Sequence, residues 1–449
     1  MREQKIKVTF GNLLDDVRIP KMYRVRQKFS RQKEEDVRSA VRREMDRLFG
    51  TEDFAGKRIA VTAGSRGISH SLAIMEEIIR FFKNKNAIPF VVPAMGSHGG
   101  GTAEGQLKVL EHFGMTEKTL GVEFCAKMDT VEAGRLLNGV PVYFSKAASE
   151  ADGIFVWNKI KPHADFKGEH ESGLVKMLAI GLGKHQGCAS LHRLGFENFP
   201  QVLPEAAKLL LKTQNIIGGL GIVENAYDEP AVIEGVLPGE LLERDRELLK
   251  LAKEHMPCLK VKEIDVLIVD EIGKNISGEG MDPNVTGRPG SYLYDGFDSV
   301  NIKTIVVLDI TEESDGNGAG IGMADITTVD CVSRLNLGAM YTNSITAGIL
   351  GPSRLPIILN NDREAIRTAI KIAAPMHPDN PRIVRIHNTL ELYEIWVSEA
   401  LAEEYRQQDG AEVREAVAFL FDEEGKLRSQ INSQAGVWES DGIHKEGDR

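Results

Sequence analysis

Residues suited to proton transfer and covalent attachment are concentrated between residues 160 and 192. This stretch contains four of the eleven histidines of the chain, His163, His170, His185 and His192. Histidine is the side chain best suited to proton transfer near neutral pH, and it is the commonest metal ligand. The stretch also places Lys176 between apolar neighbours, a setting that favours a neutral and nucleophilic amine. Imidazoles and a reactive amine in one short segment indicate an enzyme rather than a scaffold.

A second group of polar residues follows the short apolar run 59–63. That run reads IAVTA and is followed at once by Gly64, Ser65 and Arg66. An arginine at the end of a strand suits a carboxylate or a phosphate, because its planar fork donates two parallel hydrogen bonds. The alternative interpretation is a surface arginine in a turn.

A glycine-rich loop follows the next apolar run, residues 88–95, and has His98 near its start. Gly99 and Gly100 would let the backbone approach a ligand closely and leave N–H groups to hold an anion. An anion cradle alone does not require an imidazole, which favours a functional role for His98. The structural alternative is a turn in which Thr102 caps the following helix.

These residues require elements that position them, and the sequence alternates short apolar runs with amphipathic segments. The expected strands cover residues 59–63, 88–95, 140–144, 153–157, 264–273, 301–310 and 355–360. The expected helices cover residues 70–84, 105–114, 204–213, 239–255 and 361–373. Such alternation is typical of an α/β protein with a largely parallel sheet.

The length and a restart of this pattern predict two domains. A chain of 449 residues exceeds one ordinary core, and the pattern begins again after residue 258. We expect two α/β domains with mainly parallel sheets and a ligand cleft between them. The first, residues 1–258, would be catalytic, and the second, residues 259–449, would end in a polar tail. Arg66, His98 and His163 each follow an expected strand, so parallel strands would place all three on one rim of a sheet.

Composition excludes several classes of function. The net charge of −11 argues against nucleic acid or an anionic membrane surface as the main partner. The N-terminal residues have no apolar signal region, and no run is long enough to span a membrane. The four cysteines are scattered and form no CxxC motif, so neither a disulfide framework nor a structural zinc site is indicated. We therefore expect a cytoplasmic protein.

Taken in order, these motifs resemble the nickel-dependent lactate racemase family. Its members carry an arginine after one strand, Gly-x-His after the next and Pro-His after a later one. A lysine preceded by glycines follows, and a histidine lies beyond it. The matching residues here are Arg66, His98, Pro162, His163, Lys176 and His192. Lys176 and His192 are sixteen residues apart, as in the family. The resemblance covers most of the chain and is clearest over residues 58–195.

The resemblance implies a cofactor, the nickel-pincer nucleotide. This is pyridinium-3,5-bisthiocarboxylic acid mononucleotide, whose sulfur-bearing groups grip nickel and which separate enzymes synthesise. Lys176 would hold it through a thioamide, and His192 would complete the nickel coordination, since imidazole suits nickel in a near-planar site. Gly99, Gly100 and Ser65 would contribute further cofactor contacts.

The resemblance also implies a reaction, the racemisation or epimerisation of a 2-hydroxy acid. His98 and His163 would be the two acid/base groups on opposite faces of the substrate. One removes the hydroxyl proton while hydride moves from the α-carbon to the cofactor, and its return on either face inverts the stereocentre. Arg66 would hold the substrate carboxylate, and Lys274 would be a further substrate contact.

The chain departs from the family pattern in two places. The loop from His163 to Lys176 spans thirteen positions and is longer and more charged than the family's Gly-Phe-Ser-Gly-Gly-type run, which leaves His170 as a rival acid/base group. The hydrophilic neighbours of His170 and His185 otherwise predict that both are solvated or support the site from behind its lining residues. The family's Asp-x-Thr-Arg-Pro stretch corresponds here to residues 63–67, where Ala63 stands in place of the aspartate. These changes, with the added lysines Lys161, Lys167 and Lys274, would suit malate or a sugar acid better than lactate itself.

Two other functions fit the same residues. His98, His163 and His192 could bind zinc or iron for hydrolysis or lyase chemistry. Alternatively, the two domains could clamp a small anion without catalysis, using Arg66 and the glycine loop. The second alternative gives the histidines no role.

Overall fold

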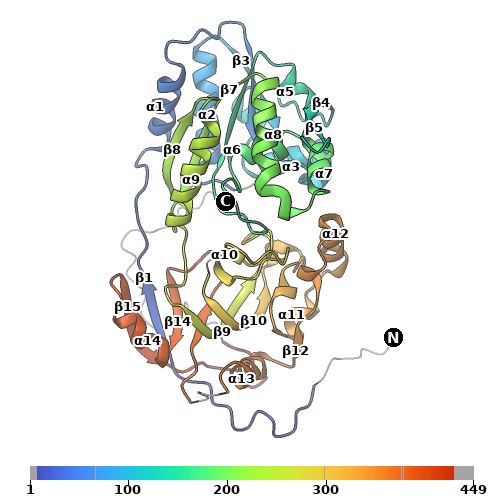
Figure 1. The fold of residues 1–449 in the computed structure, drawn as a ribbon. Helices are drawn as coiled ribbons and strands as arrows, with labels where there is room; N and C mark the ends of the chain where they lie inside the picture. The colour runs from blue at the N-terminus through green and yellow to red at the C-terminus, as the bar shows by residue number, and fades with distance from the viewer. Residues whose placement is uncertain (1–7, 66, 298, 376, 378, 429–449) are drawn as a thin grey trace.

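The computed structural model describes residues 8–65, 67–297, 299–375, 377 and 379–428. These residues form two α/β parts that lie one above the other in Figure 1. Each part is built on its own sheet, and parallel pairs outnumber antiparallel pairs in both. The expected fold class, α/β with mainly parallel sheets, is therefore confirmed.

The sheet of the upper part has five strands in the order β3-β2-β6-β7-β8. Its strands are β2 (Arg58–Ala63), β3 (Ile88–Pro93), β6 (Gly153–Lys159), β7 (Ile216–Glu224) and β8 (Pro230–Val236). The first four strands in that order are parallel, and β8 is antiparallel to β7. These strands are almost continuously apolar because helices cover both faces of the sheet.

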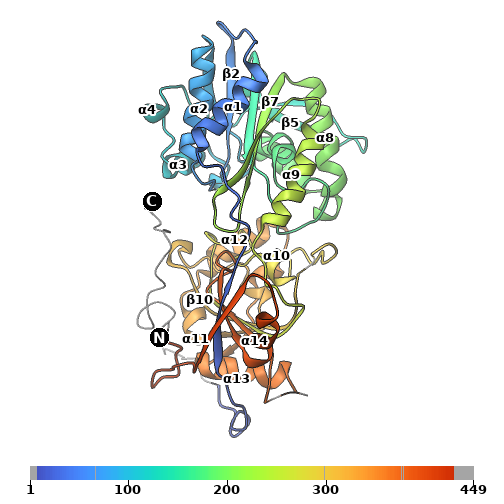
Figure 2. The same cartoon turned by 90° about the vertical axis from the view of Figure 1, so that its left-hand side faces the viewer.

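The helices of the upper part divide between the two faces. They are α1 (Val37–Phe49), α2 (Ser71–Asn84), α3 (Ala103–His112), α4 (Glu117–Leu120), α5 (Lys146–Ser149), α6 (Leu174–Lys176), α7 (Lys184–His192), α8 (Phe199–Thr213) and α9 (Leu241–His255). Figure 2 shows α1 and α2 on one side of the strands and α8 and α9 on the other. Two separate hydrophobic clusters fill these interfaces, one on each face. A hairpin of β4 (Thr130–Arg135) and β5 (Pro141–Ser145) lies outside the sheet and packs on α7.

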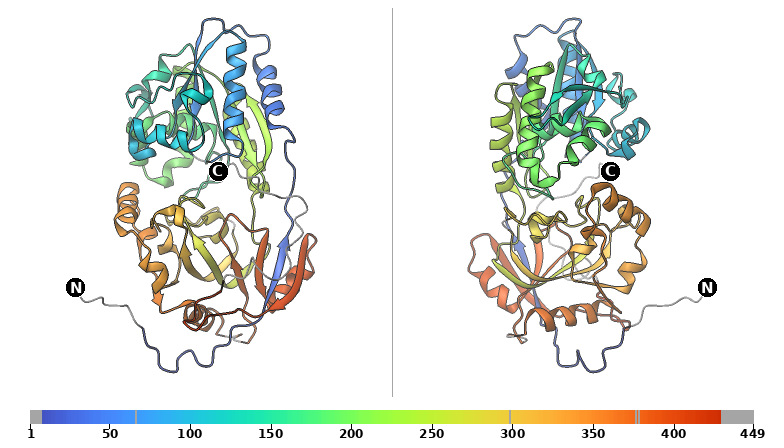
Figure 3. Two further views of the ribbon diagram at one scale, coloured as in Figure 1. Left: turned by 180° about the vertical axis from the view of Figure 1, so that it is seen from behind. Right: turned by 45° about the vertical axis from the view of Figure 1, so that its right-hand side comes forward.

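The sheet of the lower part has eight strands in the order β12-β11-β10-β9-β13-β14-β1-β15. Its strands are β1 (Met22–Gln27), β9 (Glu263–Ile272), β10 (Asn301–Ile310), β11 (Ile326–Thr328), β12 (Ile357–Leu359), β13 (Ile383–Ile386), β14 (Glu394–Ser398) and β15 (Ala411–Val417). Its helices are α10 (Pro283–Thr286), α11 (Val329–Ser333), α12 (Leu337–Ala347), α13 (Asp362–Ala373) and α14 (Glu399–Arg406). The two views of Figure 3 show these helices around the sheet, with α13 at the end far from the upper part.

One strand of the lower sheet comes from the beginning of the chain. β1 pairs antiparallel with β14 on one side and with β15 on the other, and Figure 1 shows it in blue among the red strands. The division of the chain at residue 258 stays a prediction. The sheet pairing nevertheless assigns β1 to the lower part, although the sequence interpretation had placed these residues in the first domain.

No helix within the described ranges is both long enough and apolar enough to cross a lipid bilayer.

Candidate active site

A cavity of about 290 Å³ lies between the two parts, at the carboxyl ends of β2, β3 and β6. The segments after these strands contribute Ser65, His98 and His163 to its wall. Lys176 and His192 line the same cavity. The structure thus brings together the imidazoles and the amine that the sequence singled out, although the role of each stays a prediction.

His163 and Lys176 are in direct contact. The Nζ atom of Lys176 lies 2.5 Å from Nε2 of His163, and the backbone N–H of Asp165 donates to Nδ1 of the same ring at 3.0 Å. A neutral imidazole that accepts at Nδ1 carries its proton on Nε2. That proton faces Nζ, so the pair has the geometry of a neutral lysine amine accepting a hydrogen bond. A neutral amine is the nucleophilic form of lysine.

His98 lies at the cavity wall on a loop that a buried glutamine supports. Its Nδ1 atom is 2.5 Å from the hydroxyl of Ser65. Gln106 is completely buried and donates from Nε2 to the carbonyl oxygens of Gly96 (3.1 Å) and His98 (3.4 Å). Sequence reasoning missed Gln106, and its only sequence signal is a polar residue on the inner face of α3.

His192 is held by the helix that carries it. Its Nδ1 atom lies 2.8 Å from the carbonyl oxygen of Cys188 and 3.4 Å from the Cys188 Sγ. Donation from Nδ1 to a carbonyl fixes the tautomer and leaves the lone pair on Nε2, as in histidines that bind metals.

Cys188 is a further polarisable group at this end of the cavity. Burial alone would raise the pKa of the Cys188 thiol, but hydrogen bonds with His192 and Ser97 outweigh it, and the pKa is lowered. Burial likewise opposes the effect of Cys188 on His192, whose pKa is raised on balance. The sequence interpretation gave this cysteine no role.

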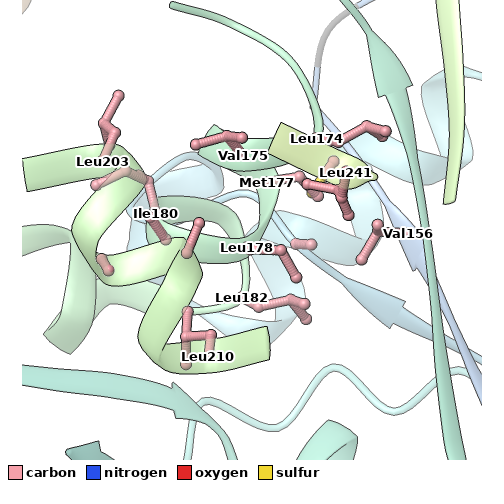
Figure 4. Close-up of a cluster of buried hydrophobic side chains, with 14 of the residues drawn as sticks. Val156, Leu174, Val175, Met177, Leu178, Ile180, Leu182, Leu203, Leu210 and Leu241 are labelled. Carbon is pink, nitrogen blue, oxygen red and sulfur yellow. The ribbon is translucent and has the colours of Figure 1, made fainter. Parts of the chain in front are cut away.

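Lys176 lies at a change in helix type. α6 ends at Lys176 and continues directly as a π-helical turn over Met177–Gly181, a feature that is frequent at functional sites. A side chain on Gly181 would approach the carbonyl oxygen of Ala94 to 2.7 Å. α6 and this turn carry buried apolar side chains, including Val175 and Leu178 (Figure 4). The amine therefore projects from a firmly packed segment.

His170 does not belong to this site. The sequence interpretation allowed three positions for it: in solvent, behind the lining residues, or at the site as a rival acid/base group. It is only 4% exposed and is absent from the cavity lining. Its Nδ1 atom pairs with Asp245 Oδ1 at 2.9 Å. Asp245 Oδ2 also accepts from the backbone N–H of Leu174 at 2.7 Å, so this carboxylate fixes the start of the helix that carries Lys176. His185, also treated as solvated, is indeed exposed.

Several other predicted ligand residues are not at the cavity. Gly99 and Gly100 belong to a 3₁₀ turn that follows His98 in the sequence, and they do not line the cavity. Lys274 does not line it either, and its Nζ donates to the carbonyl oxygen of Gly278 at 2.6 Å. Arg66 lies outside the described residues, although its neighbour Ser65 is at the wall.

The lower part closes the cavity with a single loop, residues 277–282. Four of its residues line the cavity, Ser277, Gly278, Glu279 and Asp282. Burial and the neighbouring Asp165 raise the pKa of Glu279 to about 8, and Lys274 opposes this shift. The sequence interpretation singled out Lys274 beside this loop without recognising these carboxyl groups.

Lys167 connects the two parts beside the cavity. Its ammonium donates to the carbonyl oxygen of His163 at 2.9 Å, to Glu171 at 3.2 Å and to Asn284 of the lower part. Asn284 also donates to the carbonyl oxygen of His163 at 3.2 Å. Burial lowers the pKa of Lys167, although Glu171 opposes this effect.

Comparisons with known proteins give low similarities. No protein-family model matches the chain, and no curated protein does. A lactate racemase apoprotein from Thermoanaerobacterium thermosaccharolyticum aligns with a TM-score of 0.47 at 16% identity, over 82% of this chain and 93% of that one. A Thermotoga maritima protein from a structural genomics consortium aligns with a TM-score of 0.43 at 14% identity, over 61% of this chain and 70% of that one. The functional argument therefore rests on the cavity itself.

Two kinds of metal site were predicted, a zinc or iron site of three histidines and a nickel-pincer nucleotide site. The side chains around the cavity distinguish between them. Within the described ranges, no three His, Cys, Asp or Glu side chains are close enough to form a metal site. A zinc or iron site made by His98, His163 and His192 would need such a cluster, because the protein would supply its ligands. The nickel-pincer nucleotide brings its own sulfur ligands and needs one imidazole and one amine. His192 and Lys176 in one cavity fit that requirement.

Proposed function

We propose that the protein is a racemase or epimerase of 2-hydroxy acids that uses the nickel-pincer nucleotide. The observation that carries this proposal is the arrangement of Lys176, His163, His98 and His192 around one cavity, with Lys176 and His163 in contact. An enzyme that inverts an alcohol carbon needs two acid/base groups, because the hydroxyl points in opposite directions in the two enantiomers.

Two residues would hold the cofactor. Lys176 would attach it covalently through its amine, and His192 would bind the nickel through Nε2, with Nδ1 held by the carbonyl of Cys188. When bound, the group supplies the acceptor that takes up and returns the α-hydrogen with its electron pair. Attachment also removes the amine lone pair that faces His163, so Nε2 of His163 becomes available to the substrate.

The two imidazoles would move the hydroxyl proton. His163 would act through Nε2, the atom that faces Lys176. In this role Nδ1 carries the other ring proton and would turn from the backbone N–H of Asp165 to its carboxylate, whose Oδ2 lies 3.7 Å from Nδ1. His98 acts through Nε2 as well, since Ser65 holds its Nδ1. One ring would take the hydroxyl proton from one enantiomer, and the other ring, protonated beforehand, would give its proton to the oxygen as the other enantiomer forms. Arg66, beside Ser65, stays our prediction for the carboxylate contact.

The decisive experiment combines intact-protein mass with metal analysis. The protein is co-expressed with the enzymes that make the nickel-pincer nucleotide, and Lys176→Ala is prepared in parallel. We expect a nickel-bearing adduct on the wild type and none on the variant, followed by deuterium exchange at the α-carbon of a 2-hydroxy acid. An unmodified Lys176 with bound zinc or iron would contradict the proposal and favour hydrolytic chemistry. Absence of both adduct and metal would instead favour a small-anion binding protein.

A further inference from the structure

The wall opposite the imidazoles is a short, internally bonded loop. The backbone N–H of Gly273 donates to the carbonyl of Gly280 at 2.8 Å, and Lys274 Nζ donates to the carbonyl of Gly278 at 2.6 Å. These bonds close the loop on itself, so the residues between them present a fixed surface to the cavity. Lys274 therefore supports the loop, and its charge is directed at a backbone carbonyl.

Glu279 is the residue of this loop with unused hydrogen-bonding capacity. Its Oε2 atom is buried and has no hydrogen-bond partner within the part of the chain that the structure describes. The carboxyl group lies against Gly290, where a side chain would come within 2.3 Å of Oε2. Gly290 thus leaves room for the carboxyl group in this position. A buried polar atom without a partner is costly. Oε2 itself is turned toward Gly290, and because Glu279 lines the cavity, rotation of its carboxyl group would bring this atom to a substrate.

The charge state of Glu279 indicates what kind of partner it would accept. Its pKa of about 8 means that the carboxyl is mainly protonated at neutral pH. A protonated carboxyl has one O–H donor and one carbonyl acceptor, which matches an alcohol group. Asp165 and Asp282 also line this part of the cavity, so a second carboxylate on the substrate would meet like charges.

The lysines offset this acidic wall only in part. Lys167 contacts Glu171 and the carbonyl of His163, and Lys274 contacts the carbonyl of Gly278. Much of the basic charge that seemed to suit a dicarboxylic acid such as malate is therefore directed at protein groups, although Lys161 lines the cavity and Lys274 opposes the rise in the pKa of Glu279.

We infer that Glu279 determines specificity by binding a hydroxyl group on the substrate beyond the reacting carbon, so that the substrate is a polyhydroxy acid. This inference rests on the proposed function, in which the reacting end of the substrate faces His98 and His163. An aliphatic tail would leave Glu279 without a partner, and sites built to bind a hydroxyl discriminate strongly against analogues that lack it.

The test uses the cofactor-loaded protein and three six-carbon 2-hydroxy acids. These are gluconate, 2-hydroxyhexanoate and 2-hydroxyadipate, which differ only in carrying further hydroxyls, none, or a second carboxylate. We expect kcat/KM for α-deuterium exchange to be at least about tenfold higher with gluconate than with either of the others. Calorimetric binding of gluconate to the same protein gives a readout that does not depend on turnover.

Variants connect this preference to Glu279. Glu279→Ala should lower kcat/KM for gluconate about tenfold or more, while exchange of 2-hydroxyhexanoate changes by less than about threefold. Glu279→Gln, whose amide still donates and accepts, should retain part of the preference. Glu313→Gln, an exposed glutamate of the same part, is the matched control and should leave it unchanged. Thermal unfolding of each variant shows whether it is folded.

The outcomes separate the two proposals. If some 2-hydroxy acid exchanges but gluconate is not preferred, or if Glu279→Ala leaves the preference intact, the role of Glu279 is overturned and the racemase proposal stands. If no 2-hydroxy acid exchanges on protein that carries the adduct, the proposed function fails, and the role of Glu279 fails with it.

Discussion

The two walls of the cavity are built in different ways. The upper wall takes residues from the ends of three parallel strands and from the π-helical turn, and it presents imidazoles and an amine. The lower wall is one loop, residues 277–282, and it presents carboxyl groups. Groups suited to bond making are thus on a wall supported by a whole sheet, and groups suited to selection are on a wall supported by a few backbone hydrogen bonds. The comparison predicts that substitutions in the upper wall abolish the reaction and that those in the lower wall change its substrate.

The largest expected difference is between His163→Gln and Asp282→Asn. His163→Gln should lower kcat/KM for exchange by about 10²–10⁴-fold, the usual contribution of a general acid/base. Asp282→Asn should lower it less than about tenfold, because asparagine also caps a helix well and the Asp282 side chain caps α10. Exchange rates of both loaded variants are the measurement. Equal losses would remove the proposed division between the two walls.

A second prediction concerns the support of the upper wall. Asp245→Ala should lower the free energy of unfolding by about 3–5 kcal/mol, because it leaves buried His170 and the N–H of Leu174 without their partner. Chemical denaturation gives this quantity.

The matched control for Asp245 is an exposed ion pair. Glu123→Ala removes a carboxylate that lies 3.4 Å from Arg58, with both side chains more than half exposed, and should cost less than about 1 kcal/mol. A similar cost for the two variants would show that Asp245 is not a structural support of the site.

The third prediction uses the protonation of the lower wall. The pKa of Glu279 rises from 4.5 to about 8 in the folded protein, so folding favours its protonated form. The resulting stability is fully present below pH 4.5 and is lost as the pH rises to about 8. Between pH 5 and 8 the wild type should therefore lose more unfolding free energy than Glu279→Gln, by on the order of 1 kcal/mol or more. The free energies of unfolding of both proteins are measured across this pH range. If they change by the same amount, the assignment is refuted.

The smallest expected effect concerns the contact between the walls. Lys167 and Asn284 bind each other and the same carbonyl of His163. A double-mutant cycle of Lys167→Met and Asn284→Ala should give a coupling free energy of about 0.5–1.5 kcal/mol. The control is a cycle of Lys167→Met with Asn198→Ala. The Asn198 amide forms its hydrogen bond within the upper part, so this cycle should give no coupling free energy. Zero coupling in the first cycle would mean that the walls are held together elsewhere.

Sequence reasoning predicted the upper wall because its signals are local. Apolar runs ended at β2, β3 and β6, each followed by a polar or glycine-rich segment, and parallel strands bring such ends together. Helices α2, α8, α9 and α13 were likewise predicted, and the side chain of Asn361 caps α13. These features depend on residues close together in the sequence.

The parts that were missed depend on distant contacts. His170 was treated as solvated because its neighbours are charged, but its partner Asp245 is 75 residues away. Glu279 has no periodic pattern around it, and its environment comes from Asp165 of the other part. Burial created by tertiary contact is not written in the local pattern of the chain, so both residues needed the structure.

The position of β1 has a consequence for how the protein is made. Its neighbours in the sheet, β14 and β15, come from the other end of the chain, with Met22 opposite Ser398. At roughly 5–20 residues per second of synthesis, the first strand must wait for tens of seconds before its partners leave the ribosome. The upper part, whose five strands all lie between residues 58 and 236, is complete well before that. The lower sheet therefore closes last, after β14 and β15 have been made.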